Sequence, residues 1–167
     1  MKMIDVGGKP RTERVAKARG YIAMAPATLR ILRGGRAEKG DVVAAARLAG
    51  ILAAKRTPDI VPLCHPVALS GADVSVAPRG RGVEVTATVR TVDRTGVEME
   101  ALAAVSAALL TIYDMLKRYQ RGMRIESVEL MEKAGGRSGL WVRGRRSAAP
   151  TGRARAPRAR SSRRRVG

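Results

Sequence analysis

The sequence lacks several residue types on which common functional sites depend. Its 167 residues include no Phe, one Cys (Cys64) and one His (His65). A single cysteine cannot form an intrachain disulfide, and one Cys with one His falls short of the four ligands of a structural zinc site. We therefore expect a cytoplasmic protein in a reducing environment, with no metal site built from Cys and His.

Long apolar runs are also missing. The longest uncharged stretches, residues 60–72 and 101–113, have thirteen residues each, whereas a helix needs roughly 20 to span a bilayer. Residues 1–5 contain no run of the kind found in a signal peptide. We expect no association with a membrane.

Aromatic side chains are scarce, and the 45% apolar content consists mainly of Ala, Val, Leu, Ile and Met. Small side chains make a thin core, and a thin core gains burial by association. The composition therefore favours a homo-oligomer.

The net charge of +19 is concentrated at the C-terminal end. Residues 143–167 contain ten arginines and no acidic residue, among Ala, Pro, Ser and Gly. Such a segment buries too little apolar surface to offset its ordering entropy. We predict a folded domain over 1–142 and a disordered Arg-rich tail over 143–167. The tail is either solvated and only non-specifically attractive to nucleic acid, which we favour, or a dedicated recognition arm.

Hydrophobic spacing predicts the main elements. These are strands over 14–25, 68–77, 82–92 and 124–133, helices over 42–56 and 97–121, and a short helix from Pro26 to Gly34. With the short helix treated as an insertion, the order is that of a ferredoxin-like βαββαβ fold, an α+β domain with a four-stranded antiparallel sheet and helices on one face. We expect the other face to be apolar and covered by self-association.

Two short segments contain candidate polar chemistry. His65 follows Cys64 in a turn, where a lone imidazole is either structural or a proton donor to a substrate. Glu98 and Glu100 begin the long helix, where the helix dipole favours carboxylates; being two residues apart, they do not face one site in a regular helix.

Asp114 and Lys117 lie three residues apart near the end of the same helix. They form either a surface ion pair or an acid–base pair partly shielded by the preceding apolar run. Basic residues near glycines or helix ends are candidates for phosphate binding; they are Lys9, Arg14, Lys39, Lys55, Arg56 and Lys133. The loop over residues 135–139 resembles an anion-binding loop but lacks the P-loop pattern.

Seven motifs, in this order, closely resemble those of the cyclic pyranopterin monophosphate synthase family of molybdenum cofactor biosynthesis. They are DVGGKP from Asp5, KGDV from Lys39, AKRTP from Ala54, LCHP from Leu63, GVEMEA from Gly96, TIYDM from Thr111 and the Gly135-Gly136 pair. Leu116 and Arg137 stand where that family usually has Cys and Lys. The resemblance covers about residues 3–142.

The resemblance implies a lyase that converts 3',8-cyclo-7,8-dihydroguanosine 5'-triphosphate into cyclic pyranopterin monophosphate and diphosphate. It also implies a homohexamer of three dimers, with the active site at the dimer interface. The implied catalytic residues are Asp114, Lys117 and Lys39; the implied substrate contacts are Leu63, Cys64, His65, Glu98, Met99, Glu100, Asp5 and Arg14. To these contacts we add the phosphate-binding candidate Lys133. The ring rearrangement needs proton transfers but no redox change, so we expect no cofactor.

Two other function classes fit parts of the sequence. A nucleic-acid-binding module would use the basic tail and the sheet, but no aromatic falls in the hairpin strands or the last strand to stack bases. A ligand-sensing oligomer without catalysis would leave the Asp114 and Lys117 pair without a role.

Overall fold

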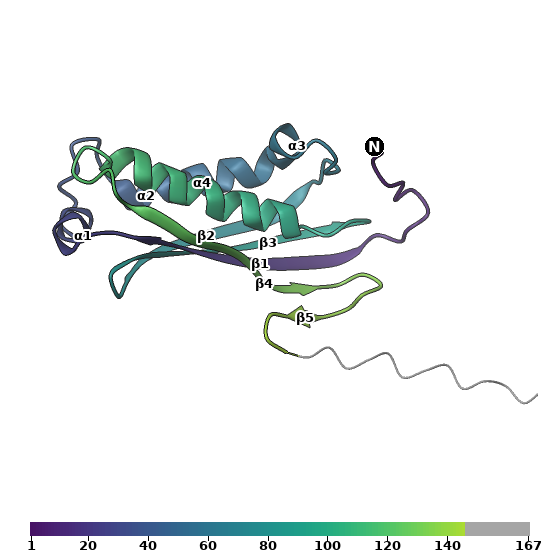
Figure 1. Ribbon diagram of the computed structural model, residues 1–167. Coiled ribbons are helices and arrows are strands. Elements are labelled where there is room, and N and C mark those ends of the chain that lie inside the picture. The colour runs from purple at the N-terminus through teal and green to yellow at the C-terminus, as the bar shows by residue number, and fades with distance from the viewer. Residues whose placement is uncertain (146–167) are drawn as a thin grey trace, which may run out of the picture.

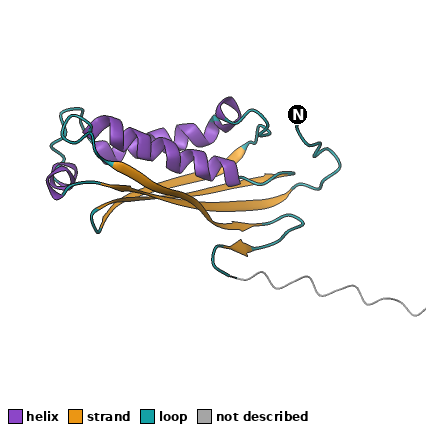
Figure 2. Ribbon diagram, viewed as in Figure 1, coloured by secondary structure: helices purple, strands orange, loops and turns teal. Residues whose placement is uncertain are grey.

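The computed structural model describes residues 1–145. Its elements are β1 (Thr12–Ala23), α1 (Pro26–Arg33), α2 (Val42–Lys55), α3 (Thr57–Ile60), β2 (Leu69–Arg79), β3 (Gly82–Asp93), α4 (Glu98–Leu116), β4 (Arg124–Ala134) and β5 (Trp141–Val142). The strands form one sheet in the order β2-β3-β1-β4-β5, and all neighbouring strands are antiparallel. Helices α2 and α4 lie side by side on one face of this sheet (Figures 1 and 2).

The alternation in β3 sets the inner face of the sheet. Val83, Val85, Ala87 and Val89 are buried, whereas the intervening Thr86 is exposed. Successive side chains of a strand point to opposite faces, so the buried set must face the helices. The strand predicted over 82–92 is confirmed.

Close approach of helix and sheet depends on glycine at one position. A Cβ on Gly20 of β1 would lie 2.6 Å from Val105 Cγ1 and 2.7 Å from Leu109 Cδ1. Both of these α4 side chains are fully buried. The absence of a side chain at Gly20 therefore lets α4 pack closely against β1.

Helix α4 is the central helix of the core. Among residues 1–145 it alone has the length and apolar composition of a membrane span, and half of that apolar window is buried inside the fold. Its buried side chains include Ala101, Ala108 and Ile112. Helix α4 is apolar because it packs against both the sheet and α2.

The structure corrects three predicted elements. The sheet has five strands rather than four, because the two residues of β5, too few for a periodic signal, pair with Glu132 and Lys133. Helix α4 ends at Leu116 rather than Arg121; the amides of Tyr119 and Gln120 fold back to the Leu116 carbonyl. A short helix that the spacing did not predict, α3, opens at Thr57-Pro58, where proline needs no N–H partner.

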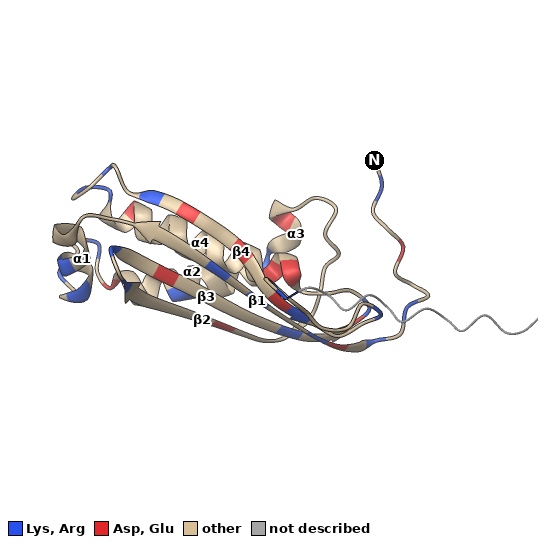
Figure 3. Ribbon diagram, turned by 60° about the horizontal axis from the view of Figure 1, so that its bottom comes forward, with Lys and Arg blue, Asp and Glu red and all other residues tan. Residues whose placement is uncertain are grey.

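The open face of the sheet is charged, so the prediction that this face is apolar is wrong. The side chains that alternate with the buried Ala16 and Ala18 are charged, and they form the ion pairs Lys17–Glu132 (3.2 Å) and Arg19–Glu129 (3.3 Å). Figure 3 shows charged residues of both signs along the strands. No second layer is needed to cover such a face.

Large apolar side chains are exposed on the helices as well. On α2, Leu48 is 59% exposed and Leu52 46%, and on α4, Leu110 is 60% exposed. The outer surface of the helix layer is therefore the apolar surface that self-association would cover.

Candidate functional site

The three predicted catalytic residues form one cluster at the C-terminal end of α4. Asp114 Oδ1 lies 2.7 Å from Lys117 Nζ, one helical turn away. Asp114 Oδ2 lies 2.6 Å from Lys39 Nζ, which also donates to the Asp114 carbonyl at 3.3 Å. Lys39 reaches this position from the turn before α2, where Gly40 has a φ of +99° and its amide donates to the Ala37 carbonyl. We name this group the Asp114 cluster.

The Asp114 cluster is strongly charged. Hydrogen bonds from Lys117 and then Lys39 lower the pKa of Asp114 to about 2, and the bond to Asp114 raises the pKa of Lys117. At neutral pH Asp114 is therefore a carboxylate and Lys117 an ammonium group. Asp114 is 51% exposed, so the predicted apolar shielding is absent from the single chain.

A second group of predicted residues lies around the N-terminal end of α4. Cys64 Sγ donates to Glu100 Oε1 over 3.5 Å. Glu100 is only 1% exposed, and its Oε2 has no hydrogen-bond partner among the described residues. Burial raises the pKa of Glu100, and burial together with Glu100 raises the pKa of Cys64 to about 11. Cys64 is therefore a neutral thiol at physiological pH rather than a reactive thiolate.

The Glu98 carboxylate does not point in the same direction as the Glu100 carboxylate. Glu98 is the first residue of α4, and its Oε2 occupies the space where a Cβ on Gly96 would lie. Glu98 thus folds back at the helix start, while Glu100 turns inward to Cys64. This divergence is what the spacing of two residues predicts. Met99, between them, is 39% exposed.

A basic hollow of about 950 Å³ opens beside this end of α4. It is lined by Gly8, Lys9, Pro10, Thr12, Arg14, Arg94, Thr95, Gly96, Gly136, Arg137 and Ser138. The lining contains four cationic side chains and no carboxylate. A smaller hollow of about 340 Å³ holds Leu63 and His65 and shares Lys9 and Thr95 with the basic hollow.

Arg14 is held in the wall of the basic hollow by backbone groups. Its Nε and Nη2 donate to the carbonyls of Asp93 and Arg94, each over 3.3 Å. A Cβ on Gly136, which has a φ of +69°, would overlap the Arg14 guanidinium. This arginine is thus placed without a carboxylate partner, as an anion-binding cation requires.

Two predicted contacts lie at the margin of the basic hollow. Lys133 donates to Ser138 of its wall. Asp5 accepts a hydrogen bond from the Gly7 amide at 2.7 Å and lines neither hollow. Lys55 and Arg56, which the sequence also suggested for phosphate binding, line neither hollow.

Sequence reasoning missed Arg94, Thr95 and Thr12 as members of the basic hollow. The run Arg94-Thr95-Gly96 directly precedes α4. A cation and a glycine just before a helix start are a signal that could have found it.

The structure does not bring the two groups together within one chain. Glu100 and Asp114 lie on the same helix, fourteen residues apart, which is about 21 Å at 1.5 Å per residue. The single chain therefore carries two separate groups of predicted site residues, which we call half-sites. One holds Asp114 and the two lysines; the other holds Cys64, Glu100 and the basic hollow.

Comparisons with known proteins identify the family of this chain. A family model described as "MoaC family" matches residues 3–136. Cyclic pyranopterin monophosphate synthase from Thermomicrobium roseum is 56% identical over 144 residues, covering 85% of this chain and 87% of the relative. The protein of the same name from Novosphingobium aromaticivorans is 58% identical (84% and 89% covered), and that from Streptomyces coelicolor is 52% identical (85% and 84% covered). Because the family model spans residues 3–136 and these relatives are similar over more than four fifths of both chains, this chain belongs to the MoaC family.

Proposed function

We propose that this chain is a cyclic pyranopterin monophosphate synthase, a lyase of molybdenum cofactor biosynthesis. Its substrate is 3',8-cyclo-7,8-dihydroguanosine 5'-triphosphate, and its products are cyclic pyranopterin monophosphate and diphosphate. The observation that carries the proposal is the Asp114 cluster, in which Lys39 and Lys117 meet one carboxylate at 2.6 and 2.7 Å. Relatives bearing this enzyme name are 52–58% identical to the chain.

The basic hollow suits the triphosphate. Lys9, Arg14, Arg94 and Arg137 supply positive charge, and the glycines of the wall allow close approach to the backbone. Arginine binds phosphate oxygens through paired N–H donors, and no carboxylate in the lining competes with the substrate. The Leu63 and His65 hollow, which adjoins through Lys9 and Thr95, is then placed to take the ring system.

The Asp114 cluster suits the proton transfers. Ring opening, pyrazine formation and closure of a cyclic phosphate each need a proton to be moved or a developing charge to be stabilised. Lys39 and Lys117 supply ammonium groups, and Asp114 holds both in place. Covering this half-exposed cluster would exclude water and raise the pKa of Asp114 from its low value.

A second copy of the chain can unite the half-sites. The outer face of α4 runs from Met99 past the exposed Leu110 to Asp114, so an apolar surface connects the two ends. If two helix layers pack with twofold symmetry and antiparallel α4 helices, the Cys64 end of each chain faces the Asp114 end of the other. This geometry supports a shared active site at a dimer interface. The homohexamer of ferredoxin-like subunits is proposed from the family resemblance.

The test is turnover of the cyclic dihydro-nucleotide, followed as pterin fluorescence after oxidation. The proposal requires a fluorescent product together with release of diphosphate. Binding without conversion would indicate a ligand-sensing oligomer instead.

A further inference from the structure

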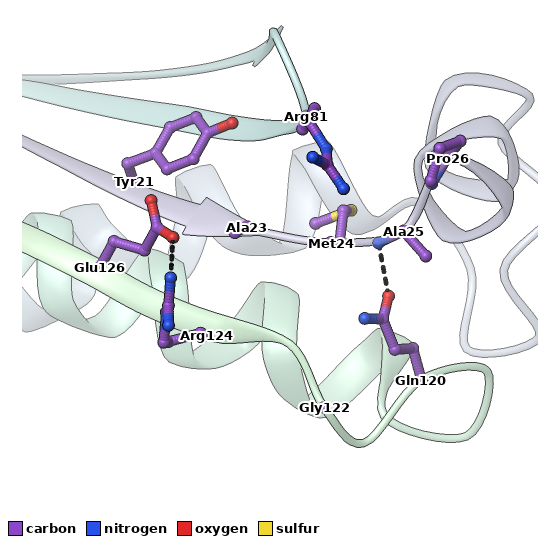
Figure 4. Close-up of a pocket in the computed structure, with 10 residues that line it drawn as sticks. All are labelled: Tyr21, Ala23, Met24, Ala25, Pro26, Arg81, Gln120, Gly122, Arg124 and Glu126. Carbon is purple, nitrogen blue, oxygen red and sulfur yellow. Dashed lines mark hydrogen bonds and ion pairs between the residues drawn. The ribbon is translucent and has the colours of Figure 1, made fainter.

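A separate hollow lies at the opposite end of the fold from the N-terminus, beside α1 (Figures 1 and 4). Its volume is about 710 Å³. The end of β1, the β2–β3 hairpin, the α4–β4 turn and the start of β4 form its walls; the lining residues that matter here are Tyr21, Met24, Arg81, Gln120, Arg124 and Glu126. None of the predicted catalytic or substrate-contact residues lines it.

The walls of this hollow are tied together by long-range hydrogen bonds. The Met24 amide donates to the Arg81 carbonyl at 3.0 Å, and the Tyr21 hydroxyl donates to the Arg79 carbonyl at 2.9 Å. These bonds join both arms of the hairpin to β1. A hollow fixed before binding loses less freedom when a ligand enters.

Gln120 is oriented by two donors. Its side-chain oxygen accepts hydrogen bonds from the Ala25 amide at 2.8 Å and from Thr28 Oγ1 at 2.9 Å. Its side-chain nitrogen has no partner among residues 1–145, and Figure 4 shows the side chain at the hollow below Ala25. The amide group is thus left as a donor of known direction.

Uncompensated arginines surround the hollow. Arg124 pairs with Glu126 at 2.6 Å, whereas Arg81, whose guanidinium reaches over the hollow in Figure 4, forms no ion pair with a described residue. A second hollow of about 350 Å³, which includes Arg30 and Arg33, shares Pro26 and Arg81 with the first. These two arginines of α1 likewise form no ion pair within the described part of the chain. Arg81 therefore stands between two adjoining concave spaces, with three free guanidinium groups around them.

We propose that these two adjoining spaces, which we call the arginine hollow, are a second binding site that takes a phosphate-bearing small molecule. Free guanidinium groups with a fixed amide donor match phosphate oxygens, which accept several hydrogen bonds at once. Hollows of a few hundred Å³ have the size of small-molecule sites. The site is separate from the proposed active site and does not depend on the proposed reaction.

The chain contains its own reporters for a test. Met24 lines the arginine hollow, and Met99 lies in the Glu98–Glu100 segment of the proposed active site. Methionine methyl groups of the full-length protein are labelled with ¹³C, the Met24 and Met99 resonances are assigned through Met24→Leu and Met99→Leu, and inorganic diphosphate is titrated at constant ionic strength. We expect a saturable shift of the Met24 resonance, whatever Met99 does.

Arg81→Ala should weaken the binding reported by Met24 by about tenfold or more, as loss of a charge-assisted contact does. Arg79→Ala is the matched control, because Arg79 is the same residue type on the same hairpin, pairs with Glu84 and lines neither space. The Arg30→Ala, Arg33→Ala double variant should also weaken binding, and it decides the matter should Arg81→Ala fail to fold.

Three results would overturn the proposal. One is a Met24 resonance that stays fixed as diphosphate is added, whether or not Met99 shifts. Another is an equal loss in Arg81→Ala and Arg79→Ala, which would indicate long-range attraction without a site. The third is a Met24 shift produced by a short single-stranded oligonucleotide but not by diphosphate, which would indicate a nucleic-acid surface.

Discussion

Asp114 Oδ2 lies 2.6 Å from Lys39 Nζ, although the two residues are 75 positions apart in the chain. Lys117, three positions from Asp114, occupies the other carboxylate oxygen at 2.7 Å. One carboxylate therefore positions two ammonium groups from two different segments.

We predict that Asp114→Ala and Lys117→Ala each lower kcat by about 10² to 10⁴-fold, the usual contribution of an acid or base. The double variant should be hardly worse than either single variant, because residues that act as a unit give non-additive losses. Thermal midpoints should stay close to wild type, since both side chains are half exposed. The measurement is kcat for all three variants. Near wild-type turnover in either single variant would show that Asp114 and Lys117 form only a surface ion pair.

Mixing variants tests whether two chains share each site. Asp114→Ala and His65→Ala alter different half-sites and should each be inactive alone. Co-expressed at equal levels and purified without selecting mixed species, they should recover about a quarter of the wild-type sites, because half of randomly formed dimers are mixed and each mixed dimer has one intact site. Activity that stays at the level of the single variants would place both half-sites in one chain.

Gly136→Ala tests the wall of the basic hollow. The added methyl group would overlap the Arg14 guanidinium, so the substrate KM should rise about tenfold or more with a smaller change in kcat. Gly139→Ala is a matched control, because Gly139 also has a positive φ (+60°) but its Cβ would meet no atom within 4 Å. Equal effects of the two substitutions would assign the change to backbone strain instead.

Burial of Glu100 predicts a pH dependence of stability. Its pKa in the folded state is raised above the ordinary 4.5, so the folded protein binds this proton more tightly than the unfolded chain. The resulting stabilisation is complete below pH 4.5 and is lost as the pH rises through the raised value. Glu100→Gln, which imitates the neutral acid, should remove this dependence and be relatively more stable than wild type at neutral pH.

Thermal unfolding of wild type and Glu100→Gln from pH 4 to pH 8 measures that difference. The gap between the two midpoints should widen in favour of the variant as the pH rises. A constant gap across the range would mean that Glu100 does not change its protonation on unfolding.

The Arg-rich tail over 143–167 lies outside the described residues, except for Arg143 to Arg145. Removing residues 144–167 takes away nine arginines and no acidic residue. We predict nearly unchanged turnover at saturating substrate and weaker, less salt-dependent retention on immobilised nucleic acid. Loss of most of the turnover would make the tail part of the active site.

Local patterns in the sequence were sufficient for much of the fold. The alternation of Val83, Val85, Ala87 and Val89 identified the buried face of β3, and the spacing of Val105, Leu109 and Ile112 identified that of α4. Periodicity records which face of an element is buried, and this is a local property. Periodicity could not predict β5, because its two residues are too few to show a period.

The sequence by itself also determined the pairing of Asp114 with Lys117, because residues three apart on a helix share a face whatever surrounds them. Only the tertiary structure decided that Lys39 joins them and that Glu100 is buried against Cys64. These relationships depend on how the turn before α2 and the loop before β2 come to rest against α4. Such long-range placement is set by packing of the whole core, and no local period encodes it.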